Sequence, residues 1–343
     1  MNAIRVKLLL LIVTLILACN GLATPTSVAT DTGQSAAPPA TAIQHNLIPV
    51  DLPEKRANQA SDADSSTTAR NEEAAGGDRF SYGDYERPFN ANTMDVYFPY
   101  LDMVDTQAFI DDTWIYATIQ MQGQDENGNL PATYAMELDV DRDGKGDWLV
   151  LVEAPQSEDW STDGVQVWQD ANDDVGGLRP TISEHDLASN DGYETNVFDS
   201  GVGADADGAW ARLSPAIPNA VELAVKRSLV DDADELIVGM WVANSLDPAQ
   251  FDINDHMTHE EAGAALRGYE NFYPIKGLAE IDNSCRVPVN FVPNGSEPGL
   301  CSVYVPDQPG QQPLACVEYG GSCGGGASCC NNVPCTGGLC RYN

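Results

Sequence analysis

The architecture is clearest in residues 132–153, which read ATYAMELDVDRDGKGDWLVLVE. Two runs rich in apolar and β-branched residues, 132–138 and 148–153, flank a short acidic segment with two glycines. Short runs of this kind, bounded by Gly, Asp, Asn or Pro, are typical of β-strands joined by turns. Residues 132–153 therefore predict two strands connected by an acidic loop.

The same pattern of short apolar runs separated by turn-forming residues extends over residues 88–283. The further strands that we expect are Met94–Tyr100, Trp114–Met121, Gly164–Trp168, Glu194–Phe198, Ala209–Leu213, Val221–Val225 and Leu236–Ala243. The run 221–229 also suits a short helix, because Glu, Leu, Ala, Lys and Arg are good helix formers. No long amphipathic helix recurs between strands, which argues against a doubly wound α/β fold. We predict an all-β domain, an antiparallel β-sandwich of the jelly-roll kind.

The acidic segment Asp139–Asp147 has the composition of a calcium loop. Ca²⁺ prefers about six to eight oxygen ligands, and Gly144 permits the sharp turn that brings such ligands together. The pattern resembles the D-x-D-x-D-G loops of EF-hands and of strand–loop–strand calcium sites. Val150 stands where an EF-hand has its bidentate Glu, so the resemblance implies the strand–loop–strand type. The alternative is a solvated acidic turn. The expected ligands are Asp139, Asp141, Asp143, Asp147 and the backbone carbonyl of Lys145.

Two weaker acidic clusters follow in the chain. The first contains Asp170, Asn172 and Asp174, and the second contains Asp252, Asn254 and Asp255. Each could hold a metal ion. Each could equally form turns, because Asp and Asn side chains bond to their own backbone.

Several aromatic residues fall opposite the aliphatic positions of the expected strands, because side chains alternate between the two faces of a strand. If these faces belong to one sheet, the aromatic rings form a platform on which a sugar could stack. Alternatively, the Trp side chains fill the edge of the core or lie beneath loops. The candidate ligand-binding residues are Trp114, Tyr116, Trp168, Trp210 and Trp241.

Three segments carry a resemblance to known sandwich families: Trp114–Tyr116, Met136–Asp139 with the acidic loop, and Asp163–Asp170. Over residues 92–281 they look like the strand order of DOMON-like domains and family 9 carbohydrate-binding modules. Those families bind sugars or, in some branches, haem, so the resemblance implies a binding module more than an enzyme. No Met–His pair for haem can be singled out, and no Cys-x-x-Cys-His is present.

The N-terminus has the features of a secretory signal. Arg5 and Lys7 precede an apolar run, residues 8–18, that is shorter than the ~20 residues needed to span a bilayer. Residues 15–19, Leu-Ile-Leu-Ala-Cys, resemble the bacterial lipobox. The resemblance implies that residues 1–18 are removed and that an acylated Cys19 anchors the chain to the envelope membrane, outside the cytoplasm. The alternative is an ordinary signal peptide with an incidental cysteine.

Residues 19–87 are rich in Ala, Thr, Ser, Pro and Asp and contain few aromatics. Such a segment buries too little apolar surface to offset its ordering entropy, so we expect a disordered tether. After removal of residues 1–18, 15 basic and 52 acidic residues remain, a net charge of −37. This charge repels nucleic acid, which we exclude as a partner, and attracts divalent cations.

Eight cysteines remain besides Cys19, an even number suited to four disulfides. Cys285 and Cys301 are expected to pair and to brace a linker, residues 284–313. Six more cysteines within residues 314–343 resemble the spacing of an inhibitor cystine knot, or knottin. That resemblance implies the pairs Cys316–Cys330, Cys323–Cys335 and Cys329–Cys340 in a small disulfide-knotted module.

The sequence offers no clear motif for catalysis. H-E-x-x-H and the P-loop do not occur, and the G-x-S-x-G spacing at residues 320–324 falls within the cysteine-rich end of the chain. We therefore expect a non-catalytic, lipid-anchored, calcium-binding surface module, with carbohydrate or another envelope component as its partner. A structural or adhesive envelope protein, in which calcium only stabilises the fold, is the alternative, and a secreted hydrolase is a third possibility. An open aromatic platform would favour carbohydrate, whereas buried Trp side chains would favour the structural role.

Overall fold

The computed structural model describes the conformation of most of the chain beyond residue 42. The described residues are 43–53, 58–71, 85–90, 95–175, 181–182, 192–248, 256–257, 280–294, 297, 300–301, 335–336 and 339–340. They form two large antiparallel sheets and two small strand pairs. The only helices in these ranges are short 3-10 turns, at Ser65–Thr67, Ala69–Asn71 and Arg227–Leu229. No helix in these ranges is long and apolar enough to cross a bilayer.

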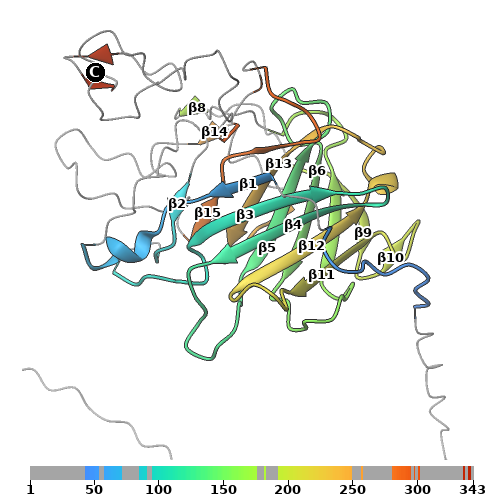
Figure 1. Ribbon diagram of the computed structural model, residues 1–343, viewed down its shortest axis with the longest axis horizontal. Coiled ribbons are helices and arrows are strands. Elements are labelled where there is room, and N and C mark those ends of the chain that lie inside the picture. The colour runs from blue at the N-terminus through green and yellow to red at the C-terminus, as the bar shows by residue number, and fades with distance from the viewer. Residues whose placement is uncertain are drawn as a thin grey trace, which may run out of the picture. The chain divides into compact units, whose positions relative to one another are not determined.

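The first sheet has five strands in the order β1-β3-β4-β12-β11, all antiparallel (Figure 1). Its central strands β4 and β12 are almost wholly buried, and the charged residues of β12, Glu222 and Lys226, form ion pairs. The bounds are β1 Asn58–Ser61, β3 Met103–Ile110, β4 Trp114–Met121, β12 Ala220–Lys226 and β11 Ala209–Leu213.

The second sheet has nine strands in the order β10-β9-β7-β6-β5-β13-β15-β2, and β16 also pairs with β13. The acidic loop joins β5 to β6, which are adjacent antiparallel strands. The bounds are β10 Val202–Gly203, β9 Thr195–Asp199, β7 Val165–Gln169, β6 Trp148–Glu153, β5 Thr133–Asp139, β13 Leu236–Ala243, β15 Ile281–Asn283, β2 Glu86–Arg87 and β16 Val287–Val289.

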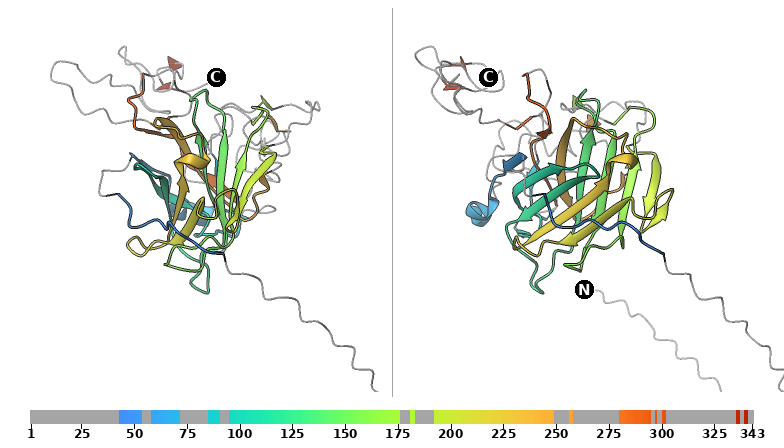
Figure 2. Two further views of the ribbon diagram at one scale, coloured as in Figure 1. Left: turned by 90° about the vertical axis from the view of Figure 1, so that its right-hand side faces the viewer. Right: turned by 45° about the vertical axis from the view of Figure 1, so that its right-hand side comes forward.

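The two sheets form layers around one core (Figures 1 and 2). Alternate residues of each strand point inward, as the period of two requires. From the first sheet, Ile115, Ile119 and Leu223 enter this core; from the second, Met136, Val150 and Met240 do. The prediction of an all-β domain built from antiparallel sheets is confirmed.

Most expected strands are present within a residue or two of their predicted ends. The expected strand Met94–Tyr100 is wrong, because residues 98–101 form a turn, in which Leu101 N–H bonds to the carbonyl of Phe98 at 2.9 Å. Pro99, which has no N–H to donate to a ladder, lies inside that turn. The helix considered for residues 221–229 is also wrong over its first six residues, which belong to β12.

The folded part of the chain extends beyond both expected boundaries. The tether was expected to reach residue 87, but β1 pairs with β3 and β2 pairs with β15. Within the expected linker 284–313, β16 is buried and pairs with β13. The tether was predicted from the low apolar content of these residues. Composition could not reveal β1 and β2, because backbone pairing, rather than a large apolar face, holds them in the sheets.

Residues 43–53 lie on the outer face of the five-stranded sheet (Figure 2). The ring of His45 is 4.7 Å from that of Trp210, and its Nδ1 is 2.9 Å from Asp207 Oδ1. The backbone N–H groups of Asn46 and Leu47 donate to the other oxygen of the same carboxylate. These contacts fix the segment 43–53, which also lies within the expected tether.

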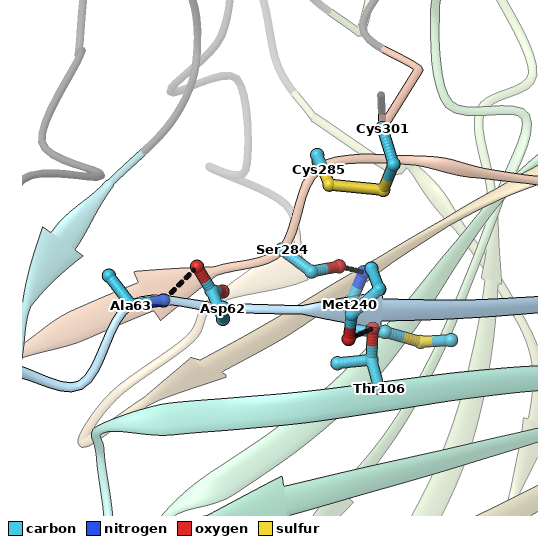
Figure 3. Close-up of a disulfide and its surroundings, with 8 residues drawn as sticks. Asp62, Ala63, Thr106, Met240, Ser284, Cys285 and Cys301 are labelled. Atoms are coloured by element: carbon cyan, nitrogen blue, oxygen red, sulfur yellow. Dashed lines mark hydrogen bonds between the residues drawn. A yellow bond between two sulfur atoms is a disulfide. The ribbon is translucent and has the colours of Figure 1, made fainter. Parts of the chain in front are cut away.

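Cys285 and Cys301 form a disulfide, as predicted (Figure 3). The neighbouring Ser284 bonds to Met240 of β13 in both directions: its N–H donates to the carbonyl oxygen, and its Oγ accepts from the N–H at 3.2 Å. Cys285 lies between β15 and β16, so the disulfide is attached at the point where the chain passes from one strand to the other.

Candidate metal centre

The loop between β5 and β6 brings three carboxylates together. Asp139 ends β5, and Asp147 directly precedes β6. Between them the backbone takes left-handed conformations at Arg142 (φ 66°) and Gly144 (φ 102°), which curl the chain. As a result, one oxygen from each of Asp139, Asp141 and Asp147 lies within 4.8 Å of the others.

Backbone N–H groups orient two carboxylates of this loop, the buried Asp139 and the half-buried Asp147. Asp139 accepts from the N–H of Arg142 at 2.5 Å and from that of Gly144 at 3.0 Å. Asp147 accepts from the N–H of Val140 at 2.6 Å. Burial raises the pKa of Asp139 to about 7 and that of Asp147 to about 6, despite these bonds. Both groups are therefore harder to ionise than ordinary aspartates, unless a cation balances them.

The donor set fits a calcium ion. Two ligands at about 2.3–2.6 Å from one ion are separated by at most about 5 Å, and the three oxygens meet this limit. All the donors are hard carboxylate oxygens, which suit Ca²⁺ and not Zn²⁺ or Cu²⁺. Residues Asp139, Asp141 and Asp147 would hold the ion and supply its charge balance.

The other two expected ligands lie differently. Asp143 is outside the group of converging carboxylates, and its Oδ1 accepts from the N–H of Lys145 at 2.8 Å. Lys145 extends its amine to the carbonyl oxygen of Asp173, 2.7 Å away. The expected role of Asp143 is therefore not supported, and that of the Lys145 carbonyl stays a prediction.

A buried polar network supports the loop from behind. Arg286 donates to the carbonyl oxygen of Gly144 at 2.7 Å and lies 3.5 Å from Asp139 Oδ2. Its other amino group is 3.4 Å from Glu137 Oε2. Glu137 also accepts from Tyr193 Oη and from Trp241 Nε1, each at 3.0 Å. No sequence motif predicts this network, because its members are up to 149 residues apart.

The second acidic cluster is also assembled in part. Oxygens of Asp170, Asp174 and Glu194 lie within 4.8 Å of one another. Asp170 accepts from the backbone N–H groups of Asp173 and Val175, and Glu194 accepts from that of Ala171. Glu194 was missed, because it lies about 20 residues beyond the run that drew attention. Asn172 is exposed. Residues 252, 254 and 255 of the remaining cluster lie outside the described residues.

The expected aromatic platform is contradicted. Trp114, Tyr116 and Trp210 lie on the outer face of the five-stranded sheet and are at most 4% exposed. Trp241 and Trp168 lie on the outer face of the other sheet, where Trp241 is 1% exposed and Trp168 is half-buried. The five aromatic residues therefore belong to two separate faces, and four of them are covered by other parts of the chain.

The remaining cysteine predictions are untested. Cys335 and Cys340 lie opposite each other in the strand pair β17 (Cys335–Thr336) and β18 (Leu339–Cys340). Cys19, Cys316, Cys323, Cys329 and Cys330 lie outside the described residues. The lipid anchor and the three knot disulfides stay predictions.

Comparison with known proteins gives no relative. No protein-family model, curated protein or solved structure matches the chain significantly.

Proposed function

We propose that this chain is a non-catalytic, calcium-binding module of the bacterial cell envelope, held to the membrane through an acylated Cys19. In this proposal calcium stabilises a jelly-roll or DOMON-like sandwich, and residues 314–343 form a knottin-like cap. The observation that supports it best is the convergence of Asp139, Asp141 and Asp147 at the end of a buried hairpin.

A structural or adhesive role fits the buried aromatic residues better than sugar binding does. Trp114, Tyr116 and Trp210 have almost no surface on which a sugar ring could stack. Carbohydrate remains a partner to be tested, because Trp168 is half-buried on the other sheet. We propose another envelope component as the first partner to seek.

Thermal unfolding of the metal-stripped protein, followed by circular dichroism, tests the calcium proposal. A calcium concentration about ten times Kd should stabilise the fold by about 1.4 kcal/mol, because only the folded state assembles the site. Mg²⁺ at the same concentration is the control for ionic strength and should raise the melting temperature less. An identical melt with and without Ca²⁺ would refute the proposal.

A glycan array, probed with the calcium-loaded protein, tests the carbohydrate alternative. We expect no binding to any glycan. Binding that a Trp168→Ala variant loses, with its melting temperature unchanged, would replace the structural role with a carbohydrate-binding one.

A further inference from the structure

A third group of carboxylates lies away from the two acidic clusters described above, where three parts of the chain meet. Glu86 of β2 is directly opposite Asp282 of β15 in the antiparallel ladder, and Asp102 directly precedes β3. One oxygen from each of the three lies within 4.8 Å of the others. All three are fully buried, at 1%, 0% and 0% exposure, whereas Asp141 of the acidic loop is exposed.

Each carboxylate in this group is held in place by a hydrogen bond through one oxygen. Asp282 Oδ2 accepts from the N–H of Met103 at 2.7 Å. Glu86 Oε1 accepts from the hydroxyl of Ser65 at 2.6 Å, and Asp102 Oδ2 accepts from the hydroxyl of Tyr97. The donors come from different segments, so the group is rigid before any ion binds.

One oxygen of Asp282 has no such bond. Within the described part of the chain, Asp282 Oδ1 is buried and accepts no hydrogen bond. A buried carboxylate oxygen left without a partner destabilises the fold, and it does so more strongly when the group is charged. Asp102 Oδ1 is likewise buried and accepts no hydrogen bond among the described residues.

Two carboxylates of the group, Asp102 and Asp282, have no positive partner in the described part of the chain. No ion pair to either of them occurs among the described residues. A bound cation or bound protons would provide the compensation that burial of these two carboxylates requires.

We propose that Glu86, Asp102 and Asp282 form a buried calcium site that fastens β2 and β15 of the second sheet to the segment that enters β3 of the first. The all-oxygen donor set excludes ions that prefer nitrogen or sulfur. Ca²⁺ suits a dry site better than Mg²⁺, which is reluctant to lose its water. The site is separate from the Asp139 loop, and neither proposal depends on the other.

The competing explanation is that the group binds protons. Burial, followed by repulsion from Glu86, Asp62 and Asp102, raises the pKa of Asp282 well above its usual value. Burial raises the pKa of Asp102 to about 6. A protonated group would be neutral and would not respond to calcium, so the two explanations give opposite results with a calcium titration.

The test counts calcium ions in the whole protein after desalting from millimolar Ca²⁺, by elemental analysis, for wild type and three variants. Asp282→Asn keeps the size of the side chain and its acceptor for Met103, but removes the charge. We expect it to lose one calcium ion per chain relative to wild type. Asp105→Asn, on β3 but outside the group, should lose none, and Asp141→Asn should affect only the loop site.

Hydrogen exchange at β1 and β2 provides a second measurement. In wild type, calcium should slow exchange of the amides of residues 58–61 and 86–87, and this effect should disappear in Asp282→Asn. Asp102→Asn should have the same effect on hydrogen exchange as Asp282→Asn. It serves as the test variant if Asp282→Asn does not fold. An unchanged calcium count together with unchanged exchange in the folded variant would overturn the proposal. The Asp139 loop proposal would be unaffected by that result.

Discussion

Arg286 donates a hydrogen bond from Nη1 to the carbonyl oxygen of Gly144 across 2.7 Å. The two residues are 142 positions apart, so the segment after Cys285 is joined directly to the acidic loop. Since Arg286 also lies beside Glu137 and Asp139, one guanidinium balances two buried carboxylates and supports the loop backbone.

Replacing Arg286 by Met should destabilise the fold by about 3–5 kcal/mol, because it leaves Glu137 and Asp139 buried without a counter-charge. Urea unfolding at fixed calcium measures the effect. Arg142→Gln is the matched control: its ion pair with Glu235 is solvent-exposed and should contribute under about 1 kcal/mol. If Arg286→Met and Arg142→Gln lose the same free energy of unfolding, the buried ion pairs of Arg286 do not stabilise the fold more than an exposed pair does.

Asp141 and Asp143 should differ in their effect on calcium. Asp141 is one of the three converging carboxylates, whereas Asp143 is not. Asp141→Asn should therefore weaken calcium binding at the loop, while Asp143→Asn should change it much less. Isothermal titration of both variants measures this, and indistinguishable isotherms for Asp141→Asn and wild type would rule out the loop as the site.

The metal-free protein should lose stability as the pH rises from about 4 to about 7. The pKa of Asp139 is about 7 and that of Asp147 about 6 in the folded state, both above the ordinary value of 3.8. In that window the folded chain holds more protons than the unfolded chain, so the free energy of unfolding falls with rising pH. Bound calcium should reverse this trend, because it requires the ionised forms.

Melting temperatures at pH 5 and pH 7.5 measure this dependence, with and without added Ca²⁺, after a chelator has removed the bound metal. Asp147→Asn, which removes one of the two groups, should flatten the slope of the metal-free protein. A metal-free protein that becomes more stable between these two pH values would contradict the assignment.

Gly146 is required by the packing of Tyr193. A Cβ at position 146 would lie 2.0 Å from Tyr193 Oη and 2.4 Å from Glu137 Oε1. Gly146→Ala should therefore destabilise the fold by about 1–3 kcal/mol. Tyr193→Phe removes the nearer clashing atom, so the double variant should be less destabilised than the sum of the singles. If the losses of unfolding free energy in the two single variants simply add in the double variant, a clash with Tyr193 is not the cause of the destabilisation.

The Cys285–Cys301 disulfide closes a loop with a sequence separation of 16. Replacing both cysteines by Ala should destabilise the fold by about 3 kcal/mol, because the unfolded chain regains the freedom that the bond removed. Urea unfolding measures this loss. An unchanged free energy of unfolding would mean that the hydrogen bonds of Ser284 hold this corner without the disulfide.

Strands with dense apolar and β-branched residues could be predicted closely. β4, β6, β11 and β13 have the predicted bounds, because their composition leaves little alternative. β3 was missed because the polar residues Asp105 to Gln107 interrupt its apolar pattern, although it pairs along most of β4. β1 and β2 were missed because their composition is that of a linker, and only their partners make them strands.

The acidic loop could be predicted because its carboxylates lie within nine residues of sequence. The group formed by Glu86, Asp102 and Asp282 could not, since strand pairing alone brings such distant residues together. The aromatic faces show a related limit. The period of a strand predicts which side chains share a face, but not which sheet contains them or what covers them.

The position of residues 43–53 affects how a smaller piece of this protein should be cut. A fragment starting at residue 88, as the sequence alone suggests, would lack the cover over Trp210 and the strand β1 that pairs with β3. It would present aromatic side chains and an open sheet edge to solvent, both of which promote self-association. A soluble fragment should therefore begin at or before Ile43.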